Sequence, residues 1–281
     1  MHSWGDELML SARWFNKENF KWRTVVNWSN NHGKVVALDD AIQDGITFGS
    51  GTTPVIVNKV YKGDYLGSLY GYTWKRTDDG QLILDSRGRP QIDWSERKLV
   101  GNAFPDWIGS IGNHFTLGNV NFGFNIEYKK GGDVFDDFRR TAIRNGNAKY
   151  TEKRYVKKLF EGVQPDGNGG YVPNTTEATL DEYWYRYSRN TWASETMLED
   201  GSWVKLRNLY IGYNLPNKFL EGTFIKKVKF NISMSNYVLW SKNQGWDPEG
   251  STYSAGSNIY GFIGYSTPLT TNYSFGLSVD F

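Results

Sequence analysis

The side chains that most often carry out chemistry in proteins are few and scattered in this sequence. The chain has no cysteine, so it has neither a disulfide nor a thiolate ligand for a metal ion. The separations of its three histidines, His2, His32 and His114, do not match known metal-ligand spacings. No nucleophile has a convincing base partner, and no glycine-rich phosphate loop follows a strand-like segment. We therefore expect no catalytic residue, no metal ion and no cofactor, and we predict that the protein is not an enzyme.

A short acidic group, Asp133, Asp136 and Asp137, is the remaining candidate for a cation site. Its spacing lacks the glycine and the terminal glutamate of an EF-hand loop. Carboxylates stabilise helix N-termini, so the group is better explained as the solvated start of a helix. The net charge is +2 and no basic stripe is present, so we expect no nucleic-acid partner.

Aromatic side chains are the most plausible ligand-binding groups. They make up 16% of the chain, and several stand in two long polar segments. Sugars present flat C–H faces that stack on aromatic rings, so such a cluster could bind a glycan. Packing among the loops explains the same residues, and both interpretations stay open. The candidates for ligand contact are Trp184, Tyr185, Trp192, Trp246 and Tyr253.

The elements that position these residues are predicted to be β-strands. The last eleven residues, 271–281, alternate apolar and polar side chains and end on Phe281. A strand has a side-chain period of two, so one face is apolar and the other polar. In a soluble β-sandwich the apolar face would pack on a second sheet. In an outer-membrane barrel it would face lipid, and the polar face would line the lumen.

The same alternation predicts nine strands in all. Short polar turns follow the first, fifth and seventh strands, and long polar connections follow most of the others. Within the connections we expect short helices at 134–144 and 150–160, and a bulge near Asn236. The predicted strands are residues 7–15, 20–28, 54–61, 66–75, 107–117, 120–128, 203–213, 225–240 and 271–281, and the long connections are 32–53, 77–105, 130–201 and 241–268.

Three features favour the barrel over the sandwich. The apolar faces are aromatic near strand ends, as at Trp14 and Trp28, and the opposite faces carry polar and charged groups. Long and short connections alternate, and outer-membrane barrels have long extracellular loops and short periplasmic turns. No apolar run approaches the roughly 20 residues that a transmembrane helix needs.

Several motifs, in order, resemble those of SusC/RagA-type TonB-dependent outer-membrane receptors. The clearest is DGSWVKLRNLYIGYNLP at 200–216, which is followed by GWDPE at 245–249. The others are LGSLYGY at 66–72, GNAFPDW at 101–107, GGDVF at 131–135 and YSTP at 265–268. Each motif alone is weak, but together they cover most of the chain.

The resemblance implies an all-β fold: about nine antiparallel strands of a transmembrane barrel with long extracellular loops, incomplete relative to a full receptor barrel of ~22 strands. Residues 1–281 would be the C-terminal portion of that barrel, with no plug domain and no signal peptide. The implied function is import of glycans or peptides across the cell outer membrane. The alternative is a secreted or surface glycan-binding β-sandwich module.

The resemblance also implies a set of partners. These are a SusD-like surface lipoprotein, outer-membrane lipid, TonB acting through the plug, and the remaining strands and plug, which would be on another polypeptide or missing. In this family an aromatic C-terminal residue is part of the signal read by the barrel-assembly machinery. Phe281 is therefore the candidate assembly signal, and a lipid-facing role in the closing strand is the simpler alternative. The substrate is not identified by the sequence.

Overall fold

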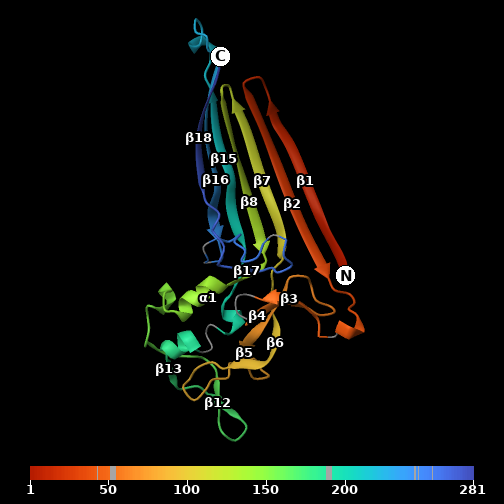
Figure 1. Ribbon diagram of the computed structural model, residues 1–281, viewed down its shortest axis with the longest axis vertical. Coiled ribbons are helices and arrows are strands. Elements are labelled where there is room, and N and C mark those ends of the chain that lie inside the picture. Colours follow the sequence, from red (N-terminus) through yellow and green to blue (C-terminus); the bar gives the residue numbers. More distant parts are fainter. Residues whose placement is uncertain (43, 51–54, 188–191, 244, 246, 255) are drawn as a thin grey trace.

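The structure, a computed structural model, describes residues 1–42, 44–50, 55–187, 192–243, 245, 247–254 and 256–281 (Figure 1). Its largest element is a 7-stranded sheet in which every neighbouring pair is antiparallel. The strands, in spatial order, are β1 (His2–Asn16), β2 (Phe20–Lys34), β7 (Pro105–Leu117), β8 (Val120–Gly131), β15 (Trp203–Asn214), β16 (Lys227–Ser241) and β18 (Asn272–Asp280).

The pairing of these strands places apolar side chains in a continuous row across one face of the sheet. Phe275 of β18 lies opposite Ile232 of β16, which lies opposite Ile211 of β15. The row continues across the remaining strands through Phe122, Phe115, Trp22 and Phe15. Because a strand alternates its faces, the adjacent row on the other face is mostly polar. That row consists of Ser274, Ser233, Tyr210, Gly123, His114, Arg23 and Arg13.

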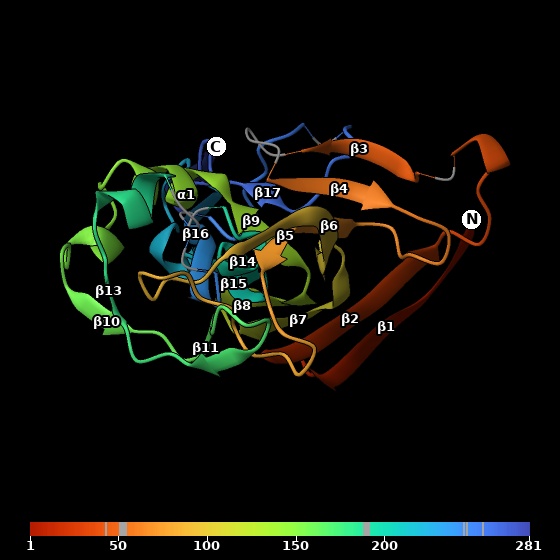
Figure 2. The same ribbon diagram turned by 90° about the horizontal axis from the view of Figure 1, so that it is seen from below.

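The described parts of the three long connections gather at one end of the sheet (Figure 1), and Figure 2 shows this end from below. We call them the cap, which comprises the described residues within 35–104, 132–202 and 242–271. Its larger sheet has four strands, β3 (Ile46–Ser50), β4 (Ile56–Val60), β5 (Ser68–Trp74) and β6 (Ile92–Asn102). A smaller sheet has the order β14 (Leu198–Asp200), β9 (Asp133–Asp136) and β17 (Phe262–Ile263). The cap also contains helix α1 (Asp137–Arg144) and the two-stranded pairs β10 (Lys157–Leu159) with β13 (Glu177–Thr179) and β11 (Val163–Pro165) with β12 (Tyr171–Pro173).

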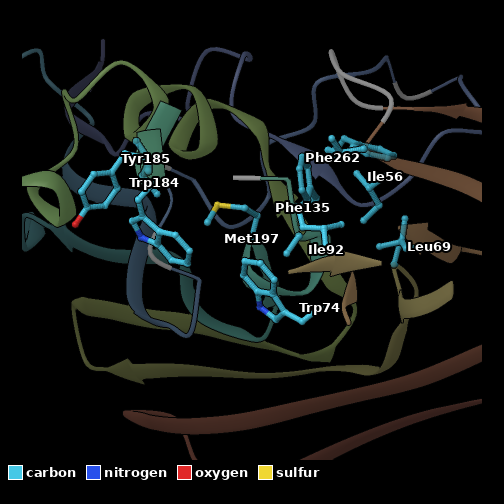
Figure 3. Close-up of a cluster of buried hydrophobic side chains, with 13 residues drawn as sticks. Ile56, Leu69, Trp74, Ile92, Phe135, Trp184, Tyr185, Met197 and Phe262 are labelled. Atoms are coloured by element: carbon cyan, nitrogen blue, oxygen red, sulfur yellow. The ribbon is translucent and has the colours of Figure 1, made fainter. Parts of the chain in front are cut away.

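The hydrophobic core lies in the cap and not in the large sheet (Figure 3). It joins side chains from all three long connections, including Leu69, Phe135 and Phe262. The indole rings of Trp74 and Trp184 stack at 6.1 Å with an angle of 4° between their planes. The cap is therefore a packed unit that holds its own connections together.

The all-β, antiparallel and incompletely closed fold is confirmed. The nine predicted strands, however, are divided between the large sheet and the cap sheet. The predicted strands at 54–61 and 66–75 exist as β4 and β5 and belong to the cap sheet, so the large sheet has seven strands and not nine. The predicted connections 32–53 and 77–105 contain β3 and β6. The prediction failed there because alternation identifies a strand but does not identify the sheet to which it pairs.

The predicted helices are only partly present. Residues 134–144 begin in β9 and continue as α1, whereas 150–160 contains no α-helix and ends in β10. The irregularity expected near Asn236 is present, since Asn236 has a φ of 59° and the register between β15 and β16 shifts between Val204 and Lys205. Among the described residues, no helix is long and apolar enough to cross a membrane.

Candidate functional site

The polar face of the large sheet is the first part of the candidate site. At its centre, His114 Nδ1 of β7 lies 3.2 Å from the Tyr210 hydroxyl of β15, across the intervening strand β8. Gly123 of β8 makes this contact possible, because a Cβ there would lie 2.5 Å from a ring carbon of Tyr210. Because Gly123 has no side chain, the Tyr210 ring can lie over β8 and its hydroxyl can reach His114.

A β-bulge in β15 directs further charge to this face. The pairing of β15 with β8 shifts register between Leu206 and Asn208, which leaves Arg207 as the extra residue. Bulges commonly redirect a side chain in this way. Arg207 Nε donates to Glu127 Oε2 of β8 at 2.5 Å, so the guanidinium lies on the polar face.

The last long connection supplies the counter-charges. Arg207 Nη1 and Nη2 donate to the two carboxylate oxygens of Glu249 at 2.7 and 2.5 Å, a bidentate arrangement. Lys205 Nζ also donates to Glu249 and lies 3.3 Å from Asp247 Oδ1. We call these five residues, Glu127, Lys205, Arg207, Asp247 and Glu249, the charge network.

Burial makes the pairing in this network necessary. Lys205 is 1% exposed, and the Trp203 ring lies 5.5 Å from its ammonium group. A buried charge is stable only when it is paired and hydrogen-bonded. Burial alone would raise the pKa of Glu249, but hydrogen bonds from Arg207 and Lys205 outweigh that effect and hold the pKa below its usual range. Glu249 is therefore a carboxylate at neutral pH, and its ion pairs with Lys205 and Arg207 link the cap to β15.

Two open grooves lie on the sheet near the cap. One, of ≈ 570 Å³, is lined by Glu7 and Ser29 from the strands and by Phe104 from the cap. The other, of ≈ 590 Å³, shares Glu7 and extends to Glu127 of the charge network. Polar groups share these grooves with apolar side chains such as Trp107 and Trp28, so the lining suits a ligand that has both hydrogen-bonding and apolar parts.

Four of the five predicted ligand-contact residues belong to the cap core or pack against it. Trp184 is 2% exposed and Tyr185 is also buried, so both support the cap core as they stand. Trp192 is partly buried, and the Tyr253 hydroxyl donates to the main-chain oxygen of Ser50 while its ring packs edge-on against Phe262. Trp246 lies outside the described residues. A direct role of these rings in binding stays a prediction.

The most exposed of the described tryptophans in the cap was not predicted. Trp94 of β6 lies between Tyr72 and Trp192, with ring centroids 4.8 and 5.9 Å away. Arg97 lies over the Tyr72 ring at 4.8 Å. The sequence around Trp94 is rich in charge and predicts a long connection, so the only available signal is the tryptophan itself.

The acidic group Asp133, Asp136 and Asp137 lies in β9 and at the start of α1. Asp136 accepts a hydrogen bond from the Arg139 main-chain N–H at 2.8 Å and caps α1, so the predicted helix start is present. The expectation that this helix start is solvated is wrong, because Asp136 and Asp137 are both buried. Burial raises the pKa of Asp136 above its usual value. Asp137 is fully buried with Arg140, and their nearest charged atoms are 3.5 Å apart. The described residues contain no group of three or more side chains placed to hold a metal ion.

Phe281 lies just beyond β18, at the end of the sheet opposite the cap (Figure 1). Its ring is 67% exposed and stacks on Phe224, with centroids 5.6 Å apart. A role of Phe281 as an assembly signal stays a prediction.

Comparison with known proteins gives relatives for the whole length of the chain. No protein-family model matches it. TonB-dependent receptors P3, P26 and P39 of Formosa agariphila are 25%, 23% and 22% identical, and each alignment covers 99% of this chain. The chain spans less than a third of these relatives, between 28% and 30% of their length.

Solved structures share the fold. The RagAB peptide transporter superposes with a TM-score of 0.64 at 17% identity, over 99% of this chain and 29% of that chain. The RagAB peptide importer in its open-open state gives a TM-score of 0.62 at 17% identity, over 99% of this chain and 28% of that chain. The chain resembles a segment of a SusC/RagA-type TonB-dependent receptor. The resemblance seen in the motifs is thereby confirmed.

The SusC/RagA-like motifs have a physical relationship in the structure. The motif at 200–216 supplies Lys205 and Arg207, and the motif at 245–249 supplies Asp247 and Glu249. The two motifs therefore meet in the charge network. In the cap, the motif at 131–135 runs into β9.

Proposed function

We propose that this chain forms the C-terminal part of the barrel of a TonB-dependent transporter in the cell outer membrane. The observation that carries the proposal is the apolar row across all seven strands, which has a largely polar row on the opposite face. Such a sheet suits lipid on one side and a wet lumen on the other. The names of the relatives, receptors and transporters, support a role in nutrient import and not in catalysis.

The transporter would work with several partners. A SusD-like surface lipoprotein would bind at the cap end, where the long connections gather, and TonB would act through a plug supplied with the remaining strands. The solved relatives are described as a peptide transporter and a peptide importer, which supports peptides as cargo. The aromatic rings of the cap, Trp94 among them, support glycans equally well.

A soluble glycan-binding sandwich is the weaker proposal. It would need a second sheet packed on the apolar face of the first. The four-stranded sheet lies instead at the end of the large sheet (Figure 1), and the side chains of Ile211, Ile232 and Phe275 are exposed. Covering that face with lipid accounts for the exposure.

The test is an in-frame deletion of the coding sequence in the organism that carries it, complemented by the intact locus. We expect the protein in the outer-membrane fraction. We expect the deletion to abolish both growth on and uptake of one ligand class, either labelled oligopeptides or labelled oligosaccharides. Complementation should restore growth and uptake. A protein found in the soluble fraction, with uptake of both classes unchanged by the deletion, would contradict the proposal.

A further inference from the structure

The turn between β15 and β16, residues 215–226, reaches back to the end of β18. The Phe224 ring stacks on the Phe281 ring with centroids 5.6 Å apart and 17° between the planes. Phe224 is 77% exposed and Phe281 67% exposed, so the two rings contact each other without belonging to a core. Their contact joins two segments that are 57 residues apart in the sequence numbering, 224 and 281.

Lys226 adds two hydrogen bonds at the same place. Its main-chain N–H donates to the main-chain oxygen of Asp280 at 2.8 Å. Its Nζ donates to the main-chain oxygen of Phe281 at 2.8 Å. Two residues of one turn thus hold the end of β18 through a ring contact, a main-chain bond and a side-chain bond.

The position of β18 explains why its end needs holding. β18 is the last strand in the order of the large sheet, and its only described neighbour in that sheet is β16. The β16–β18 ladder runs without a register shift from Lys227 opposite Asp280 to Ser235 opposite Asn272. A one-residue slip would exchange the apolar and polar faces, and strand ends fray unless they are tied down.

We infer that Phe224 and Lys226 form a register lock on β18. The lock presents the free edge of β18 in a single register to the strand that pairs with it when the barrel closes. A slip of two residues keeps the apolar and polar faces correct but moves Phe281 along β16 by about 7 Å. That movement breaks the ring contact with Phe224 and the hydrogen bond from Lys226 Nζ. The lock therefore acts against two-residue slips in either direction, which the apolar pattern tolerates. The inference rests on the proposed barrel, because only a closing sheet has such a pairing step.

Disulfide crosslinking can measure the register directly, because the chain has no cysteine of its own. Ser233 and Ser274 lie directly opposite each other on the polar face, so the double variant Ser233→Cys, Ser274→Cys reports the native register. Ser233→Cys combined with Asn272→Cys or with Gly276→Cys reports a two-residue slip. In the native register these diagonal positions are about 7–8 Å apart, which is too far for a disulfide.

Phe224→Ala with Lys226→Ala, in the full-length protein in its native outer membrane, removes the two side-chain contacts of the lock and leaves the main-chain bond to Asp280. The matched control is Phe219→Ala with Lys218→Ala, from the same turn. Phe219 is similarly exposed, at 60%, and Lys218 Nζ lies 5.0 Å from the centroid of the Phe219 ring. We expect the off-register crosslinked fraction to rise about fivefold without the lock and to stay unchanged in the control, with Phe281→Ala giving an intermediate rise.

Equal crosslinking patterns in the two double variants would overturn the inference. If the lock variant accumulates too poorly to score, Phe224→Leu, which keeps apolar bulk and removes the ring, is scored in the same way. Transport plays no part in this readout. If the protein imports nothing but the lock variant shows the off-register rise, the inference stands and the proposed transport function fails. If the protein imports normally and the rise is absent, the inference fails.

Discussion

In the seven-stranded sheet one face carries large apolar side chains at the surface, whereas the cap buries a cluster of such side chains in a hydrophobic core. Ile232 and Phe275 of the sheet are exposed, while Phe135 and Phe262 of the cap are fully or almost fully covered. Both regions are built mainly from antiparallel strands. What differs is the surroundings that each region requires.

In the proposed barrel, this difference corresponds to two surroundings, water for the cap and lipid for the apolar face of the sheet. A cap that lies in water must make its own core, because burial of apolar surface is the dominant favourable term in folding. A sheet whose outer face meets lipid gains nothing from covering that face with protein. The charge network lies where the two regions meet, and it joins the wall of the sheet to the last connection of the cap by ion pairs instead of apolar contacts.

The largest effect should come from the cap core. Phe135→Ala removes a fully buried ring that packs edge-on against Phe262, with centroids 6.1 Å apart. We expect a loss of about 3–5 kcal/mol of cap stability from lost burial and the cavity left behind. Limited proteolysis should cut the cap faster, while the heat-modifiable folded barrel stays at the normal level. Leu159→Ala, at an exposed cap position, is the control and should leave proteolysis unchanged. Loss of the barrel together with the cap would show that the two regions do not fold separately.

A lipid-facing substitution should have the next largest effect. Ile232→Arg places a charge near the middle of β16 on the apolar face, where insertion costs about 2–4 kcal/mol at the bilayer midplane. Ser233→Arg, the next residue, points to the polar face and should cost far less. The folded fraction in lipid vesicles, measured by heat modifiability, separates the two. Equal losses would mean that the apolar face does not meet lipid.

The sequence predicted the sheet better than the cap for a physical reason. In the sheet, apolar and polar side chains alternate along the strands, as the proposed position between lipid and a lumen would require, so strands such as β7 and β8 and the turn at Gly118 could be predicted from the sequence. In the cap, short strands are held by contacts from distant segments. β9, for example, pairs with β14 and β17, which are far along the chain. Nothing local in those segments specifies their partners.

The candidate site shows the same limit. The motifs that contain Lys205 and Glu249 could be recognised from the sequence, but their meeting depends on the path of the last connection across the sheet. Trp184 was an attractive ligand contact because it stands in an aromatic-rich segment. Its burial depends on stacking with Trp74, more than a hundred residues earlier, and periodicity does not report such a contact.

The smallest of the three effects should come from the junction between the regions. Glu249→Gln keeps the shape of the side chain but removes the charge that Lys205 and Arg207 face. Hydrogen bonds to charged groups contribute about 1.5–3 kcal/mol, and Glu249 is partly exposed, so we expect a loss of about 1–2 kcal/mol. Hydrogen exchange at the Leu269 amide, which donates to Asp247 at 2.7 Å, should report the loosened connection.

Glu177→Gln is the matched control, because Glu177 pairs with Lys157 at 3.8 Å on an exposed surface of the cap. Exposed pairs contribute about 0–1 kcal/mol, so this change should leave the Leu269 amide protected. The contrast between the two variants separates a junction held by buried charge from one held by the cap core alone. Faster exchange in Glu249→Gln with an intact cap core would assign the link to the charge network. Unchanged exchange would instead place it in the contacts of β17 with β9.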